Sequence, residues 1–483
     1  MSAVRADVVR VRAALSPLLA GFACTLVVWG LSVAAPLRAQ GGDTVASRLG
    51  AAVFACKGTL DLGEVSWLET RPDAKLPYYV RRARDGGVVS VFGPAPGFVG
   101  SMAMEGLARD ASVLDTELAR RARHAAALLT AISTGLLFVA LRASASTRIA
   151  AFGALVAGLS YAGAATAGQG LWQFTTALPF LCGAIACLAW APRSRLARVL
   201  CPSLLLVWWQ IRPTAVGLAL GVGLAWLASM WFFEKPRPRV IWATVAVTIA
   251  IAVSLPFAIY NQAKLGTPIP IAQYEAASKY AQAGPRFALS PSHLVSSTLG
   301  LLASPGRGLL FFAPIVLVGF VDLARSIRRP TSTFLASDSS VFAWARLGLF
   351  FQFSVAAGWF VWWGGVCFGP RLVAEAVWLG VAAVFATHAA RSRIGRACAI
   401  AAGVLTTAVG LLGLFRHDPR LWDLRRDIEH NQSVVWDFSD SPISALLTRS
   451  PPDDELVDAP RGPYLFCPQE GQALRLLETP AAR

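Results

Sequence analysis

Long apolar runs separated by short polar connections extend over most of the chain. We interpret eleven of these runs as spanning segments, because a helix needs roughly 20 apolar residues to cross the hydrocarbon core of a bilayer, although 199–211 and 347–363 are shorter. Their approximate ranges are 13–36, 122–141, 148–166, 171–191, 199–211, 214–233, 240–260, 306–324, 347–363, 371–390 and 397–415. The pattern predicts an all-α polytopic membrane protein with about 11 transmembrane helices, and residues 292–303 are apolar enough for a further half-helix.

Basic residues are concentrated in every second connection between these runs. Connections such as 192–198, 235–239 and 391–396 carry Arg and Lys without acids, whereas the alternate connections hold nearly every Asp and Glu. Short loops rich in Lys and Arg belong on the cytoplasmic side. We therefore expect a multi-pass protein of the plasma (inner) membrane with its N-terminus in the cytoplasm and its C-terminus on the outer, periplasmic side.

Three long segments then fall on the outer side, namely 38–121, 261–305 and the tail after Phe415. Within the first loop, the apolar stretches 47–56 and 97–108 are too short to span and are expected to lie as helices in the interface plane. The predicted organisation is one transmembrane domain over residues 1–415, which includes the outer loop 38–121, followed by a small outer tail over residues 416–483.

The composition agrees with a membrane protein, because 55% of the 483 residues are hydrophobic and only 15% are charged, against about 25% in soluble proteins. The net charge of +16 comes from the loop clusters, and without a nucleic-acid-binding signature it predicts no nucleic-acid partner. No C-x-x-C pair and no ligand spacing of histidines occurs, so no cofactor or zinc site is identified, while a divalent metal stays open.

Three cysteines, Cys56, Cys367 and Cys467, fall on the outer side under this topology, where the environment is oxidising. Spacing along the chain does not show whether the Cα atoms of any two approach within the roughly 7 Å that a disulfide requires. The sequence therefore leaves a disulfide among them undecided.

Asp43 is the first candidate for chemistry. It follows Gly41 and Gly42 a few residues after the first apolar run ends, so an acid stands where a helix leaves the bilayer. In that place it can meet both a lipid-borne and a water-soluble substrate. The alternative is that Asp43 with Thr44 caps a following helix, a position that favours Asp and Thr.

The stretch Trp362-Trp363-Gly364-Gly365-Val366-Cys367-Phe368-Gly369-Pro370-Arg371 is the most specific one in the chain. Its Gly and Pro residues break the helix at the outer face, which is tolerated at membrane depth mainly where backbone lines protein or a cavity. Arg371 would then stand at a helix N-terminus and bind an anion such as phosphate. The alternative is that Arg371 pairs with Glu375 at i,i+4 and anchors the helix end.

Two further outer turns carry candidate binding groups. Arg212, in Arg-Pro-Thr, is either a second phosphate contact or an interfacial arginine that snorkels to water. Gln169, Trp172 and Gln173 could hydrogen-bond and stack a sugar, although a helix start with a tryptophan anchor explains the same residues. Trp363 and Glu375 join these as candidate sugar or acceptor contacts. The turn 304–308, which includes Arg307, has the same two interpretations.

Taken in this order, these stretches resemble the GT-C class of polytopic glycosyltransferases, which includes protein mannosyltransferases and bacterial lipid A arabinosyltransferases. The shared features are a first helix, Asp43 at its outer end, a long outer loop with interface helices and a many-helix bundle. The chain looks most similar to bacterial members that carry Gly-Asp-Thr (42–44), Leu-Trp-Gln (171–173), Arg-Pro-Thr (212–214) and Trp-Trp-Gly-Gly…Gly-Pro-Arg (362–371).

The resemblance implies a polyprenyl-phosphate sugar donor, Asp43 as the general base, and Arg212 and Arg371 as candidate contacts of the donor phosphate. Many members also have a second acid in the next outer loop, but residues 167–170 contain none. Glu64, Glu105 or another outer acid would have to replace it, or catalysis would be weak or lost. The sugar, hexose or pentose, and the acceptor, which could be a glycan, a lipid or a protein, are not specified.

Two other functions remain open on the sequence. A transporter or flippase is disfavoured because the apolar segments carry ionisable residues only near their ends and no inverted repeat is visible. A non-catalytic membrane protein with the same fold would share the whole hydrophobic pattern.

Overall fold

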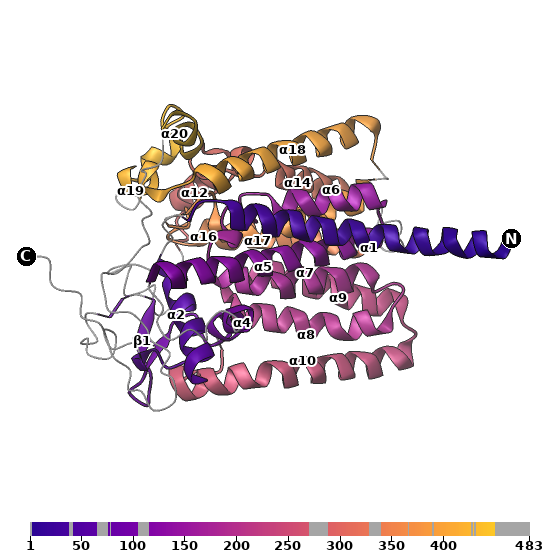
Figure 1. The fold of residues 1–483 in the computed structure, drawn as a ribbon, viewed down its shortest axis with the longest axis horizontal. Coiled ribbons are helices and arrows are strands. Elements are labelled where there is room, and N and C mark those ends of the chain that lie inside the picture. The colour runs from indigo at the N-terminus through magenta and orange to yellow at the C-terminus, as the bar shows by residue number, and fades with distance from the viewer. Residues whose placement is uncertain are drawn as a thin grey trace, which may run out of the picture.

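The computed structural model describes residues 2–37, 42–64, 76–77, 79–104, 115–269, 288–327, 340–365, 367–388, 391–426, 428 and 431–449. These residues are mostly helical and form an elongated bundle (Figure 1). The N-terminus leaves the bundle at one end, and short helices and a small hairpin gather at the other.

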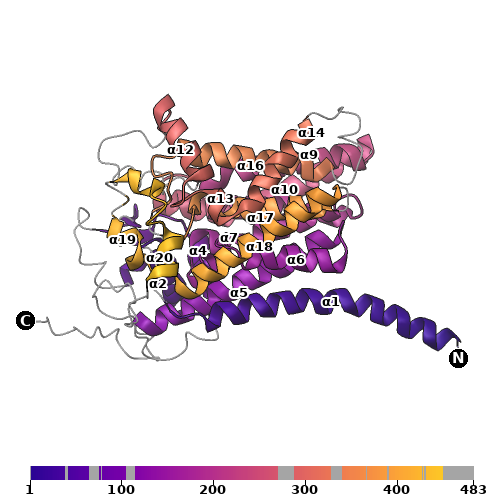
Figure 2. The same cartoon turned by 90° about the horizontal axis from the view of Figure 1, so that it is seen from above.

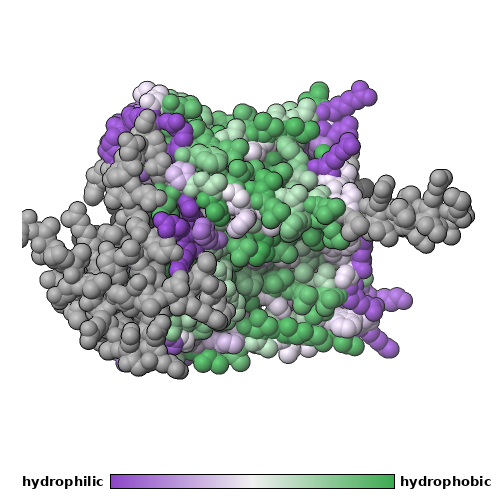
Figure 3. Space-filling view, in the orientation of Figure 1, coloured by the Kyte–Doolittle hydropathy of each residue, from purple (hydrophilic) through white to green (hydrophobic). Residues whose placement is uncertain are grey.

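Six of the described helical segments are long and apolar enough to cross a membrane. They belong to α1 (Ser2–Ala34), α5 (Asp115–Arg142), α7 (Gln173–Trp190), η5 (Pro213–Ala215) with α9 (Val216–Phe233), α10 (Pro236–Leu265) and α18 (Arg393–Arg416). A band of apolar side chains covers the visible face of the bundle between two hydrophilic ends (Figure 3). The chain is therefore a helical, multi-pass membrane protein.

The other five predicted spans coincide with helices that do not meet this criterion. These are α6 (Thr147–Gly158), α8 (Arg195–Ile211), α14 (Pro314–Ile327), α16 (Ser340–Gly358) and α17 (Ala374–Ala386). The run predicted over 148–166 stops at Gly158, and 306–324 is divided into α13 (Leu309–Phe312) and α14, because Pro314 disfavours helical backbone at Ala313. The predicted half-helix is present as α12 (Pro291–Ala303). The count of 11 crossings stays a prediction.

The core of the bundle lies around α17. Every residue of α17 is buried, and the helix packs against α14, α16 and α6. Seen from above, α17 lies inside the bundle while α1 follows its outer side (Figure 2). The Gly-rich stretch and Arg371 directly precede α17, so this fully buried helix anchors the segment that carries the arginine.

The outer loop folds onto one end of the bundle. It forms α2 (Gly42–Lys57), η1 (Leu62–Glu64), the antiparallel strands β1 (Val80–Arg82) and β2 (Val88–Ser90), and α4 (Ala95–Met104). Gly97 lets α2 and α4 approach closely, because a Cβ there would lie 3.2 Å from the carbonyl carbon of Gly50. The two predicted loop helices exist, but both pack on the bundle, and their place in a membrane interface stays a prediction.

The tail after α18 is not merely a polar extension. Its described part forms η8 (Pro419–Leu421), α19 (Asp423–Arg426), η9 (Gln432–Trp436) and α20 (Pro442–Thr448). α20 packs against α18, and Trp422, Val435 and Leu446 are buried. α19 and α20 lie at the same end of the bundle as α2 (Figure 1). Residues 450–483 lie outside the described residues.

Candidate functional site

Asp43 and Arg371 form an ion pair at the outer-loop end of the bundle. Oδ2 of Asp43 lies 2.6 Å from Nη1 of Arg371, and the two side chains are 18% and 17% exposed. The guanidinium carbon of Arg371 also lies 4.9 Å from the ring centroid of Trp172. The structure thus brings three candidates from three distant stretches together, with Asp43 and Arg371 partly accessible and Trp172 buried.

Asp43 stands in the first turn of α2, where a negative charge is favoured by the helix dipole. The capping alternative therefore explains why Asp43 stands at the start of a helix, but it does not explain the ion pair that its carboxylate forms with Arg371. Arg371 begins η6 (Arg371–Val373), a single 3₁₀ turn that leads into α17. Trp172 directly precedes α7, as the helix-start interpretation predicts, and its ring also contacts the arginine.

Glycines with positive φ shape the loop before Arg371, which we call the Gly-rich loop (residues 363–365 and 367–371). Gly364, Gly365 and Gly369 have φ values of 82°, 73° and 82°, a backbone region that glycine tolerates best. A Cβ at Gly369 would come within 2.6 Å of the Tyr161 ring, and one at Gly364 within 3.2 Å of the Arg371 Cβ. The loop conformation therefore requires glycine at these positions.

Two hydrogen bonds hold the second half of this loop from the turn that follows α6. The Tyr161 hydroxyl donates to the carbonyl of Pro370 over 3.2 Å, and the Thr166 hydroxyl donates to the carbonyl of Phe368 over 3.3 Å. Both donors are buried. Sequence reasoning missed them because they fall in a run predicted to be continuous helix, and their hydroxyl groups were the only available signal.

Arg307 holds the first half of the loop, a role that the sequence did not indicate. Its side chain is fully buried, with Nε donating to the carbonyl of Trp363 over 3.0 Å and Nη2 to that of Gly365 over 3.2 Å. Nη2 also pairs with the carboxylate of Asp423. In the sequence, only its position beside a predicted apolar segment distinguishes this arginine.

Asp423 keeps its charge in this buried place. Burial on its own would raise its pKa, but the Arg307 guanidinium and a hydrogen bond with His417 outweigh that effect and lower the pKa below its usual value. Nε2 of His417 lies 3.2 Å from Oδ2 of Asp423. The guanidinium of Arg307 further lies 5.1 Å from the ring centroid of Trp422.

Arg212 and Glu375 form a second, deeper ion pair. Nε of Arg212 lies 2.8 Å from Oε1 of Glu375, and its Nη1 donates to Oε1 of Gln173 over 3.1 Å. All three residues are buried. Glu375 Oε2 and Gln173 Nε2 have no hydrogen-bond partner among the described residues.

This arrangement corrects two interpretations made from the sequence. The predicted i,i+4 pair of Arg371 with Glu375 is wrong, because Arg371 precedes α17 in a 3₁₀ turn and its side chain contacts Asp43 instead. A snorkelling Arg212 is also wrong, because its guanidinium turns into the bundle toward Glu375. The assignment of Arg212 to a donor phosphate stays a prediction.

The remaining candidates have structural contacts. Gln169 Nε2 donates to the carbonyls of Ser32 and Ala164 over 3.3 and 3.2 Å, which ties the end of α1 to η4 (Ala167–Gln169). Trp363 is buried, and its Nε1 has no hydrogen-bond partner in the described part of the chain. The side chains of Glu64 and Glu105, proposed as substitutes for a second acid, lie outside the described residues.

Within the described ranges, no group of three or more His, Cys, Asp and Glu side chains could hold a metal ion.

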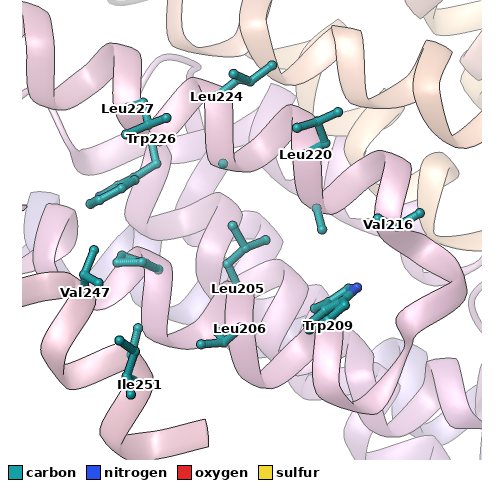
Figure 4. Close-up of a pocket in the computed structure, with 14 residues that line it drawn as sticks. Leu205, Leu206, Trp209, Val216, Leu220, Leu224, Trp226, Leu227, Val247 and Ile251 are labelled. Atoms are coloured by element: carbon teal, nitrogen blue, oxygen red, sulfur yellow. The ribbon is translucent and has the colours of Figure 1, made fainter. Parts of the chain in front are cut away.

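A lateral groove of about 510 Å³ lies between α8, α9 and α10 (Figure 4). Its lining is apolar and includes Leu205, Trp209, Leu220, Trp226 and Ile251. No candidate polar residue lines this groove.

No protein-family model and no curated protein matches the chain. Among solved structures, it is similar to the apo oligosaccharyltransferase of Archaeoglobus fulgidus, with 15% identity, a TM-score of 0.48 and 91% of this chain covered. It is also similar to ArnT from Cupriavidus metallidurans bound to undecaprenyl phosphate, with 15% identity, a TM-score of 0.47 and coverage of 89% of this chain and 76% of that one.

A third similar structure is the oligosaccharyltransferase AglB from Archaeoglobus fulgidus in complex with an inhibitory peptide and a dolichol-phosphate, with 13% identity, a TM-score of 0.47 and 90% of this chain covered. The chain spans 62% and 61% of the two archaeal structures. Because all three TM-scores lie below 0.5, the functional proposal rests on the residues of this chain.

Proposed function

We propose that the chain is a membrane glycosyltransferase that moves a hexosyl or pentosyl group from a polyprenyl-phosphate donor to an acceptor hydroxyl at the outer face of the plasma membrane. The observation that carries this proposal is the contact of Arg371 with both Asp43 and Trp172. It joins a proton acceptor, an anion-binding group and an aromatic ring in a membrane protein, and the two charged side chains are partly exposed.

In the proposed reaction, the acceptor oxygen attacks the anomeric carbon from the face opposite the phosphate. The bond between that carbon and the phosphate oxygen breaks, so the sugar inverts and polyprenyl phosphate leaves. Asp43 takes the proton of the acceptor hydroxyl. General-base assistance of this kind contributes roughly 10²–10⁴-fold.

Arg371 stabilises the phosphate, which gains negative charge as it leaves. Its planar guanidinium matches phosphate oxygens, and preorganised charge at the leaving group is often the largest single contribution to catalysis. The ion pair explains how both roles combine. When the donor phosphate binds the guanidinium in place of Asp43, Oδ2 of Asp43 becomes available and accepts the proton.

A lipid-linked donor also fits an apolar groove on the side of the bundle. The groove between α8, α9 and α10 has a lining of apolar side chains and a volume of about 510 Å³ (Figure 4). Leu220, Leu227 and Ile251 on its rim are exposed on the surface of the bundle. Such a lateral groove can hold part of a polyprenyl chain, whereas a nucleotide-linked donor would require polar contacts.

The same proposal includes the topology, with eleven crossings and a cytoplasmic N-terminus. Supporting it, the basic connections after α7, α9 and α17 lie at the end of the bundle where the N-terminus leaves (Figure 1). Asp43 and Arg371 belong to elements at the opposite end. By the positive-inside rule, the site then faces the outer side.

One observation favours a transporter or flippase instead, because the Arg212–Glu375 pair is buried inside the bundle and intramembrane ion pairs often mark substrate pathways. Reconstituted liposomes with a panel of undecaprenyl-phosphate sugars and a membrane extract as acceptor source separate the two. A transferase releases free undecaprenyl phosphate, measured by mass spectrometry. Lipid that changes leaflet without this release would support the alternative and contradict the proposal.

A further inference from the structure

The segment after α18 reaches into the Gly-rich loop through one buried ion pair. Arg307 and Asp423 have exposed side-chain fractions of 0% and 1%. Their guanidinium and carboxylate lie between the turn that follows α12 and the start of α19. Two opposite charges buried this completely persist only when their remaining polar atoms are also satisfied.

The hydrogen bonds of Arg307 are directed at the loop backbone on both sides of Gly364. Its Nε bonds the carbonyl of Trp363 over 3.0 Å, and its Nη2 bonds that of Gly365 over 3.2 Å. Gly364 in turn packs against Arg371, since a Cβ there would lie 3.3 Å from the Arg371 backbone nitrogen. The contacts of Arg307 therefore lead through a single residue to the arginine of the candidate site.

Asp423 is fixed from its own side. Its Oδ2 contacts His417 over 3.2 Å, and His417 follows the last turn of α18. The Phe368 ring of the Gly-rich loop also lies 5.1 Å from the His417 ring. Two independent contacts thus join this C-terminal segment to the loop.

We propose that Asp423, acting through Arg307, is a positioning residue that holds the Gly-rich loop so that Arg371 faces Asp43 and Trp172. The segment 417–426, predicted to be an accessory tail, then forms part of the machinery that presents Arg371 to the donor phosphate. The link from loop geometry to donor binding rests on the proposed function, whereas the link from Asp423 to loop geometry does not.

A native thiol reports on the loop. Cys367 is a free cysteine with 3% exposure, and its Sγ lies 3.4 Å from the carbonyl oxygen of Gly369 and 3.7 Å from those of Gly364 and Gly365. Alkylation of this thiol requires the loop to open. Its rate, read from its own peptide by mass spectrometry, measures loop opening whatever the protein does.

The variants are Asp423→Asn, which keeps the shape and removes the charge, and the milder His417→Gln. Asp85→Asn is the control, because Asp85 forms an ion pair with Lys264 and, among the described residues, no hydrogen bond or ion pair with the Gly-rich loop. In nanodiscs we expect Cys367 alkylation at least about tenfold faster in Asp423→Asn, a change of about 1.4 kcal/mol in loop opening. His417→Gln should be intermediate and the control unchanged. Wild-type rates in both test variants would overturn the proposal.

Donor binding is tested with undecaprenyl phosphate as the probe in a double-mutant cycle. We expect Asp423→Asn and Arg371→Ala each to weaken binding about tenfold, and the double variant to bind no more weakly than Arg371→Ala, because one change acts through the other. A further tenfold loss in the double variant would overturn the positioning role. Wild-type binding by Arg371→Ala would instead refute the proposed phosphate contact, and the alkylation result would still decide whether Asp423 holds the loop.

Discussion

The buried pair of Arg212 and Glu375 allows a quantitative test of the bundle. Arg212→Met removes the partner of a carboxylate whose side chain is 0% exposed. Breaking a buried pair in this way costs about 3–5 kcal/mol. We therefore expect Arg212→Met to lower the free energy of unfolding by about 3–5 kcal/mol.

Glu375→Gln should cost less than Arg212→Met, because the guanidinium of Arg212 keeps its contact with Gln173.

Reversible unfolding in mixed micelles, followed by helical circular dichroism, measures these free energies. The double variant Arg212→Met with Glu375→Gln carries no buried charge and should recover most of the loss. Additive costs in the double variant would refute the assignment of a coupled buried pair.

Three further outcomes follow from single features. Gly369→Ala should destabilise the protein and abolish transfer, because the added Cβ would lie 2.6 Å from Tyr161 and the backbone φ is 82°. Gly30→Ala, with open space around it, should be tolerated. Thermal unfolding and transfer activity compare the two variants, and equal behaviour would contradict the loop geometry. Cys56 is disulfide-bonded, so its peptide should be alkylated only after reduction; labelling without a reductant would exclude the bond. Leu447 is exposed, so the variant Leu447→Cys should react with an impermeant maleimide in intact spheroplasts, whereas Ser194→Cys should not. The reverse labelling pattern would show that the topology is the opposite of the proposed one.

The sequence predicts the helices well because burial in lipid leaves a strong signal. Runs of about 20 apolar residues identify the spans, and both short outer-loop helices appear close to their predicted ranges. The boundaries fail where a local residue overrides the apolar pattern. Pro314 divides one predicted helix, and the run that was to continue to residue 166 ends at Gly158.

Partners across the fold are harder to derive. The sequence identifies Asp43, Arg212, Arg371 and Glu375 as notable, but sequence distance alone favours the local pair of Arg371 with Glu375. In the structure, Arg371 pairs with Asp43, and Glu375 pairs with Arg212. The reason is that the Gly-rich loop turns Arg371 outward, while Arg212 turns into the bundle. Such pairings depend on packing between segments, which periodicity does not encode.

Arg307 illustrates the same difficulty. From the sequence it is one arginine in a turn before an apolar run, and such residues often lie at a membrane interface. Its burial depends on Asp423, more than a hundred residues later, and on carbonyls freed by the positive-φ glycines of the Gly-rich loop. Neither feature is visible in the neighbouring sequence.

The most direct test of the proposed function is sugar transfer by Asp43→Asn. Asparagine keeps the shape of the side chain and its suitability at a helix start, but it does not accept a proton at neutral pH. With a panel of undecaprenyl-phosphate sugars, the release of undecaprenyl phosphate should fall by roughly 10²-fold or more, while Asp85→Asn keeps wild-type release. Near-wild-type release by Asp43→Asn would remove this carboxylate from the mechanism and contradict the account of the site.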